Sequence, residues 1–178
     1  MRLRRLKRPP PTQPPAQRSP PAMDRRPSPP RIDSLLSKDR VACGQCATSK
    51  KRVLENAAAL LAAANPDLNI TTVFESLMSR ERLGSTGLGH GIALPHGRLP
   101  YRGPPVGAFI TLREAVDFDA PDEHPVNQIF ALIIPDNAAE EHLQILAALA
   151  RLFNDPKIRE QLQHCDAPDR AIDLFRDR

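Results

Sequence analysis

The hydrophobic pattern is clearest between Lys50 and Ala64, where apolar residues recur at helical spacing. Thr48 or Ser49 can cap this segment at its start, and Asn65-Pro66 stops it. The apolar residues fall on one face of a helix, which consists of Val53, Leu54, Ala57, Leu60, Leu61 and Ala64. The pattern therefore predicts a helix over 50–64 that packs against a core on one side.

A second helix is predicted just before a glycine-rich stretch. Thr72 and Glu75 have the spacing of a capping box, and Gly84 ends the segment. Arg80 falls in the last turn, where basic side chains commonly complement the helix dipole. The residues predicted to face inward are Phe74, Leu77 and Met78.

Three apolar runs have the character of strands. Residues 106–112 are rich in β-branched and aromatic side chains, and a continuous apolar run lies within a second predicted strand over 126–134. Ile92 to Leu94 fit a strand of minimal length. Pro95 should end that strand because proline has no backbone N–H to donate.

The C-terminal part of the chain predicts three further helices. Asn137 can cap the first with Glu140 at the reciprocal position, Asp155-Pro156 opens the second, and the third covers 168–175. Strands interleaved with helices indicate an α/β fold, a single domain whose mixed β-sheet is flanked by helices on both faces. The first of the three helices is predicted to bury Leu143, Leu146, Ala147, Ala150, Leu152 and Phe153.

Composition divides the chain into a tail and a domain. Ten of the 20 prolines and nine of the 25 Lys and Arg residues precede Ile32, but only one of the 21 acidic residues does. We therefore expect residues 1–31 to form a disordered Pro/Arg-rich tail and residues 32–177 to form one domain. Met23 is a second candidate for the start of translation.

The distributions of charge and of apolar residues exclude several classes of function. The domain carries an excess of acidic residues, so the basic character of the whole chain belongs to the tail and does not indicate specific nucleic-acid binding. No apolar run reaches the length of a membrane span, and no apolar segment of a secretory signal follows the basic start. We expect a cytoplasmic protein without membrane insertion.

Cys43 and Cys46 have the C-x-x-C spacing that can hold zinc or form a redox pair. A structural zinc site needs a second pair, for which the chain offers the distant His164 and Cys165. A redox pair should open a helix directly after a strand, whereas this pair lies several residues before the predicted helix. We therefore expect neither a metal site nor a cofactor.

The stretch with the most chemical information is SRERLGSTGLGHGIALPHGR, which covers 79–98. His96 stands between Pro95 and Gly97, a setting that holds the ring firmly. Gly97 has no side chain, so a bulky group can approach the backbone beside the histidine. A neutral imidazole is a competent nucleophile near pH 7 if a hydrogen bond fixes its tautomer.

The glycines of this stretch suit a concavity of backbone N–H groups that binds an anion. Ser85 and Thr86 can add hydroxyl donors to it. A dinucleotide-binding turn is not expected, because the third glycine lacks the right spacing and a strand follows in place of a helix.

The whole stretch resembles the phosphorylation-site segment of the type-2 EIIA domains of the bacterial phosphoenolpyruvate-dependent phosphotransferase system. These are the fructose, mannitol and nitrogen-related EIIA proteins, whose pattern is Arg-Glu-x-x-Gly-Ser-Thr-Gly-x-Gly-x-Gly-Ile-Ala-x-Pro-His-Gly. Nearly every fixed position is filled here, and the Gly-Ser-Thr-Gly form is similar to that of the nitrogen-regulatory branch. The resemblance covers roughly residues 32–177.

The resemblance implies specific roles for three side chains. His96 would carry a phosphoryl group on Nε2, and Arg80 would bind the phosphoryl oxygens. His142, in a segment that resembles the one carrying the second active-site histidine, would support His96. The donor would be a small phosphocarrier protein of the HPr type or its nitrogen-branch relative, NPr, and no metal would take part.

The resemblance leaves three functions open. The one it favours is a regulatory EIIA that binds other proteins according to its phosphorylation, including potassium-transport and sensor-kinase components. The second is a sugar-specific EIIA that passes the phosphoryl group to a fructose- or mannitol-type IIB domain. The third is a protein-binding module that has lost phosphotransfer.

Overall fold

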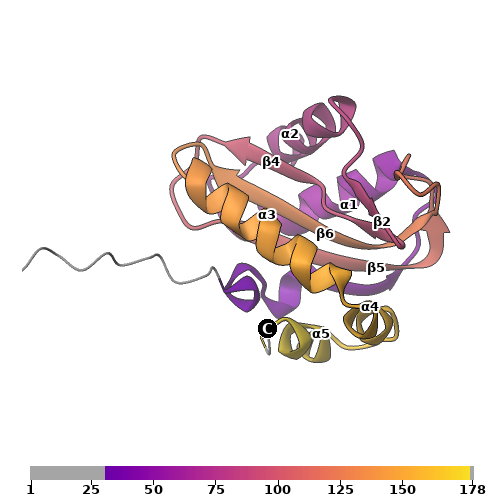
Figure 1. Cartoon of the computed structure of the whole chain (residues 1–178). Helices are drawn as coiled ribbons and strands as arrows, with labels where there is room; N and C mark the ends of the chain where they lie inside the picture. The colour runs from indigo at the N-terminus through magenta and orange to yellow at the C-terminus, as the bar shows by residue number, and fades with distance from the viewer. Residues whose placement is uncertain (1–30, 177–178) are drawn as a thin grey trace, which may run out of the picture.

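A computed structural model describes residues 31–176 of the chain (Figure 1). The tail predicted over 1–31 therefore lies, apart from Arg31, outside the described residues. Two short 3₁₀ helices, η1 (Ile32–Leu35) and η2 (Lys38–Arg40), lead into the domain. The strands are β1 (Val41–Gln45), β2 (Gly87–Gly89), β3 (Ile92–Ala93), β4 (His96–Leu99), β5 (Val106–Val116) and β6 (Val126–Pro135). The helices are α1 (Lys50–Ala62), α2 (Ile70–Arg82), α3 (Ala139–Asn154), α4 (Pro156–Gln163) and α5 (Pro168–Arg176).

The strands form one mixed sheet in the order β1-β5-β6-β3-β2, and β4 pairs with β6 beyond the end of β3. β5 and β6 are antiparallel, whereas β1 is parallel to β5, and β3 and β4 are both parallel to β6. β6 is therefore the central strand, and it sets the position of the segment that contains His96. The predicted mixed sheet is confirmed.

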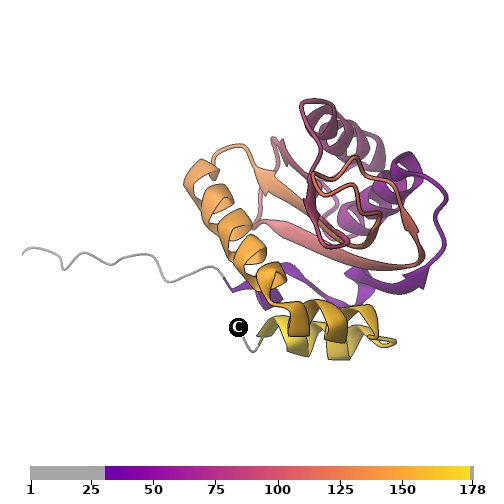
Figure 2. The ribbon, with the colours of Figure 1, turned by 45° about the vertical axis from the view of Figure 1, so that its right-hand side comes forward.

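Helices cover both faces of the sheet, as the sequence predicts (Figure 2). α1 and α2 pack on one face over Ala108, Ile110 and Ile133. α3, α4 and α5 pack on the other face, where side chains of alternate strand positions form a second core. The aromatic centre of that core consists of Phe109, Phe130, Phe153 and Phe175, with ring centroids 5.1–6.5 Å apart.

Local capping signals predicted some helix starts correctly and others wrongly. The side chain of Ser49 accepts a hydrogen bond from the backbone of Arg52 and caps α1, and Asp155 caps α4 in the same way. α2 begins earlier than predicted, because Asn69 accepts from the backbone of Thr71 and makes the capping box at Thr72 unnecessary. Asn137 does not cap α3, whose first turn has no side-chain cap.

The buried face of α3 differs from the predicted one. Leu152 and Phe153 are buried as expected, but Leu143 is 70% exposed, and Ala147 and Ala150 are exposed as well. The core side of the helix consists of Ile145, Leu149, Leu152 and Phe153. The helix is apolar on more than one side, so periodicity alone did not identify the buried side.

Three strands, β1, β2 and β4, were missed, and β2 lies within the glycine-rich stretch. β1 contains a Cys-Gly pair and lacks the long apolar run by which β5 and β6 were predicted. The minimal strand ends before Pro95, as predicted, since β3 stops at Ala93, but a new strand, β4, begins directly after the proline. The chain resumes pairing with β6 at once, with His96 opposite Leu132. His96 is thus the first residue of a strand and not the residue after one.

No helix within residues 31–176 combines the length and the apolar character that crossing a bilayer requires.

The corrected orientation of α3 predicts unequal costs for truncating two of its leucines. Leu149→Ala removes a fully buried side chain and should lower the free energy of unfolding by about 3 kcal/mol. Leu143→Ala removes an exposed side chain and should change it by less than about 0.5 kcal/mol. Denaturant unfolding of both variants measures the difference, and equal losses would contradict this orientation of α3.

Candidate functional site

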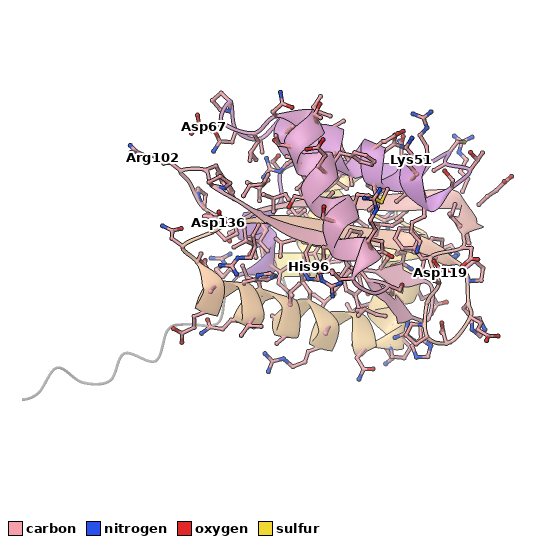
Figure 3. All side chains as sticks on the ribbon, turned by 90° about the horizontal axis from the view of Figure 1, so that it is seen from above. Lys51, Asp67, His96, Arg102, Asp119 and Asp136 are labelled. Atoms are coloured by element: carbon pink, nitrogen blue, oxygen red, sulfur yellow. The ribbon has the colours of Figure 1, made fainter. Side chains whose placement is uncertain are left out.

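The imidazole of His96 is fixed by the backbone just before it. Its Nδ1 lies 2.8 Å from the carbonyl oxygen of Leu94. A carbonyl only accepts hydrogen bonds, so Nδ1 carries the ring proton and Nε2 keeps a free electron pair. The ring is half-buried, between the ribbons of α2 and α3 (Figure 3). The geometry therefore leaves Nε2 as the nucleophilic atom.

Arg80 reaches His96 from the last turn of α2. Its Nε donates to Nε2 of His96 at 3.1 Å, and its NH1 donates to the carbonyl oxygen of Gly84 at 3.0 Å. α2 packs beside β4, which brings two positions sixteen residues apart into contact. The guanidinium is thus held at Nε2 of His96.

His142 is the third side chain of the group. It lies in the first turn of α3, and its ring meets that of His96 edge-on at a centroid distance of 5.3 Å and an angle of 76°. Its Nε2 is buried and has no hydrogen-bond partner among the described residues. The structure therefore brings Arg80, His96 and His142 together from three different elements.

Burial and neighbouring cations lower the pKa of both histidines. Desolvation is the largest cause for His96, and the positive charge of Arg80 adds to it, while the hydrogen bond to Leu94 and the charge of Glu81 act in the opposite direction. Desolvation also lowers the pKa of His142, followed by the charges of His96, Arg98 and Arg80. Both rings are therefore neutral near pH 7.

These lowered pKa values also make stability depend on pH. The unfolded chain, in which an imidazole titrates near about 6.5, binds the additional protons more readily than the native protein. The corresponding stability is fully present above that pH. It is lost as the pH falls from there through the lower pKa values of the native histidines.

The glycine-rich stretch forms a tight hairpin between β2 and β3. The two residues of its loop, His90 and Gly91, both have positive φ (53° and 78°), as a two-residue hairpin turn of type I′ requires. The backbone N–H of His90 donates to Asp122 at 2.7 Å. The hairpin thus shapes one side of the site.

Ser85 and Thr86 do not present their hydroxyl groups as free donors, contrary to expectation. The hydroxyl of Ser85 donates to the carbonyl of Phe118 and accepts from the backbone of Gly87. The hydroxyl and the backbone N–H of Thr86 both donate to Glu81. Both residues line the cavity beside His96, but their hydroxyl hydrogens hold the loop in place.

Gly97 was expected to leave room for an incoming group, but the structure gives another reason for a glycine at this position. A Cβ at this position would lie 2.2 Å from Oγ of Ser76 and 3.2 Å from Cδ1 of Ile133. Gly97 is buried, so the missing side chain admits α2 and not an incoming ligand. The close approach of α2 to β4 is what brings Arg80 to His96.

A surface cavity of about 340 Å³ opens at His96. Its polar side is made by Arg80 and the loop at Ser85 and Thr86, and its other side by α3. The side chains of α3 and the hairpin that border it are Leu88, Leu146, Ala147 and Ala150. The supposed core residues of α3 thus border the site.

Sequence reasoning missed one charged group beside the site. Glu81 is 7% exposed, follows Arg80 in the chain, and receives hydrogen bonds from Thr86 and from Lys50. An acidic residue in a last helical turn is unfavourable for the helix dipole, and this was the signal that the sequence contained.

The C-x-x-C pair lies away from these residues. Cys43 is in β1, Cys46 follows that strand, and both are free thiols. Burial raises the pKa of Cys43 to about 11, so its thiolate is a minor form at pH 7. Among residues 31–176, no three His, Cys, Asp or Glu side chains are grouped to hold a metal ion.

The geometry predicts how His96 titrates. In NMR spectra of ring-labelled protein, His96 should be the Nδ1–H tautomer at pH 7 and should titrate below the ordinary 6.5. Arg80→Gln should raise its pKa, because a positive charge next to the ring disappears. A fall of the His96 pKa in this variant, or an Nε2–H tautomer in the wild type, would contradict the assigned geometry.

Comparison with known proteins shows the family to which the chain belongs. The sequence profile of the family described as "Phosphoenolpyruvate-dependent sugar phosphotransferase system, EIIA 2" matches residues 34–178. A nitrogen regulatory protein of Pseudomonas aeruginosa is 42% identical over 133 residues, which cover 75% of this chain and 86% of that protein. The crystal structure of nitrogen regulatory protein IIA-Ntr from Neisseria meningitidis has a TM-score of 0.76 at 42% identity, over 81% of this chain and 98% of that one. The chain therefore belongs to the type-2 EIIA family of the phosphoenolpyruvate-dependent phosphotransferase system and is similar to its nitrogen regulatory members.

Proposed function

We propose that Nε2 of His96 accepts a phosphoryl group from the phosphohistidine of a small carrier protein of the HPr or NPr type. The observation that carries this proposal is the 3.1 Å contact between Nε of Arg80 and Nε2 of His96 at the mouth of a cavity. A cation beside a nucleophilic nitrogen, with the other nitrogen tied to a carbonyl, is the arrangement that transfer of an anionic group requires.

The transfer replaces one nitrogen–phosphorus bond by another. The electron pair on Nε2 of His96 forms a bond to phosphorus while the bond to the carrier's imidazole breaks. The electrons of the broken bond return to the carrier's nitrogen, and the carrier's ring, protonated on its other nitrogen, leaves as neutral imidazole. The proton of His96 stays on Nδ1, hydrogen-bonded to the carbonyl oxygen of Leu94. The phosphorylated ring therefore carries the positive charge that the carrier's ring gives up.

Arg80 has a different contact before and after transfer. Its Nε now donates to the electron pair that must attack phosphorus, so the guanidinium has to move to a phosphoryl oxygen as the bond forms. Its NH1 contact with Gly84 keeps it close during that movement. His142, with an unpartnered Nε2 beside the site, supplies a second group that can donate to the phosphoryl oxygens when it has its proton on that atom.

The surface around the cavity suits a small protein donor. Leu83 is 85% exposed, Leu143 is 70% exposed, and Leu88 is 43% exposed. They come from the end of α2, from α3 and from the hairpin, the same elements that surround His96. Large apolar side chains exposed on neighbouring elements are a mark of a protein-binding surface, so these leucines support a protein as the donor.

The resemblance to nitrogen regulatory proteins favours a regulatory output. On this proposal the protein binds its targets according to whether His96 is phosphorylated, and the targets include potassium-transport and sensor-kinase components. A phosphoryl group adds up to about two negative charges at His96, which is enough to change the choice of partner.

The direct test is phosphorylation with phosphoenolpyruvate, enzyme I and an HPr- or NPr-type carrier. The wild type should acquire an acid-labile phosphoryl group on one histidine, and His96→Ala should acquire none. Equal labelling of the two proteins would exclude His96 as the acceptor. Rapid onward transfer of the label to a sugar-specific IIB domain would show the sugar-transport function in place of the regulatory one.

The contribution of Arg80 can be measured separately. Arg80→Gln should slow phosphoryl transfer by about a hundredfold, the range for loss of one donor that stabilises charge in the transition state. Arg82→Gln is the matched control, because Arg82 is exposed on the same helical turn and should leave the rate unchanged. Equal rates for Arg80→Gln and the wild type would exclude a role for this guanidinium in transfer.

A further inference from the structure

The last turn of α2 carries a second charged side chain that phosphoryl transfer as described above does not use. Glu81 is buried, and its carboxylate accepts three hydrogen bonds. The donors are Nζ of Lys50 at 3.0 Å, the backbone N–H of Thr86 at 3.0 Å, and the hydroxyl of Thr86. Burial of a carboxylate is costly unless it is paired and hydrogen-bonded, so this complete set of partners indicates a fixed position.

Lys50 neutralises this carboxylate from the first residue of α1. Its side chain is 22% exposed, its Nζ also lies 2.6 Å from Asp119, and it sits 5.3 Å from the ring centroid of Phe118. Burial alone would lower the pKa of Lys50, but the bonds to Asp119 and Glu81 raise it overall. The ammonium group therefore remains charged and connects α1, α2 and the loop at Asp119.

The hydrogen bonds continue from Glu81 to the nucleophile. The carbonyl oxygen of Thr86 accepts from the backbone N–H of Leu94 at 3.0 Å. The carbonyl oxygen of Leu94 then accepts from Nδ1 of His96 at 2.8 Å. Leu94 is thus held through its N–H by Thr86, which Glu81 fixes, and it holds His96 through its carbonyl oxygen.

Glu81 also affects the second functional side chain, because it is adjacent to Arg80 in the chain. The backbone N–H of Gly84 donates to the carbonyl of Glu81 at 3.2 Å, and the carbonyl of Gly84 accepts from Arg80. Gly84, in the turn from α2 into the hairpin, therefore bonds to the backbone of Glu81 through its N–H and to the side chain of Arg80 through its carbonyl. A movement of Glu81 would displace both.

We propose that Glu81, neutralised by Lys50, is a positioning residue for phosphoryl transfer: through Thr86 and Leu94 it holds His96 in the Nδ1–H tautomer with Nε2 toward Arg80. This inference rests on the proposed function of His96. Lys50 has a distinct part in it. It cancels the charge of a carboxylate that would otherwise lie, uncompensated, close to an incoming phosphoryl group.

The first test measures the pKa and the tautomer of His96 in the unphosphorylated protein, so it does not depend on phosphotransfer. In NMR titrations, Glu81→Gln should lower the pKa of His96, because the negative charge of Glu81 raises it in the wild type. It should also increase the mobility of the ring or the fraction of the Nε2–H tautomer. Glu75→Gln is the matched control, since Glu75 is exposed six residues earlier on α2 and should change neither property.

The second test measures single-turnover phosphorylation by the phosphorylated carrier. Glu81→Gln should react about tenfold to a hundredfold more slowly, as do proteins that lose a group orienting a metal-ligating histidine. Thr86→Val keeps the shape and the backbone N–H of Thr86 but loses its hydroxyl, and should cost a few-fold. The double variant should be no slower than Glu81→Gln alone, because both changes break the same link.

Folding and function are separated by measuring thermal unfolding of each variant and assaying well below its midpoint. If Glu81→Gln does not fold, Thr86→Val alone decides: an unchanged rate with an unchanged His96 tautomer overturns the positioning role. If the wild type takes up no phosphoryl group on His96, the proposed function fails, whatever Glu81 does. If the wild type is phosphorylated while Glu81→Gln matches it in rate, His96 pKa and tautomer, the proposed function stands and the positioning role is wrong.

Discussion

The site depends on one hydrogen bond, from Nδ1 of His96 to the carbonyl of Leu94. That carbonyl is available because the chain leaves the sheet between β3 and β4, where Pro95 has no N–H to contribute to a ladder. The strands on both sides of the interruption pair with β6, so the break does not loosen the segment. A short irregularity between two anchored strands thus gives the ring a backbone acceptor that regular strand pairing would have used.

Burial and Arg80 act on this ring in the same direction before transfer and in opposite directions afterwards. Both lower the pKa of the free imidazole, so Nε2 has its electron pair at neutral pH. Once a phosphoryl group is attached, burial disfavours the added charge, whereas the guanidinium stabilises it. On the proposed function, the same arginine that helps to keep the nucleophile neutral would then compensate the charge of the product. A lysine has no planar fork with which to bond the nitrogen and afterwards two oxygens.

The sequence predicted those features that depend on neighbours along the chain. The caps at Ser49 and Asp155 and the apolar runs of β5 and β6 are local signals, and the long glycine-rich pattern identified His96, Arg80 and, by its companion segment, His142. The roles of Ser85, Thr86 and Gly97 were predicted wrongly, because their partners are Phe118, Glu81 and Ser76, which the sequence does not place beside them. The side of α3 was also wrong, since a helix that borders both a core and an apolar interface gives no single periodic signal.

The burial of Glu81 beside Arg80 could be recognised only from the fold, and it raises the question of how the charges around His96 are balanced. Lys50 is paired with both Glu81 and Asp119, so Arg80 is the cation that remains in contact with the neutral ring of His96. On the proposed function, a phosphoryl group of up to about two negative charges would meet this guanidinium and the positive charge of the ring that carries it. Leu88 lines the cavity beside these groups, and the exposed Leu83 and Leu143 lie at the end of α2 and on α3. On the proposed function, phosphorylation would place an anion beside Arg80, and a protein partner that contacts these elements would sense the difference without any change of fold.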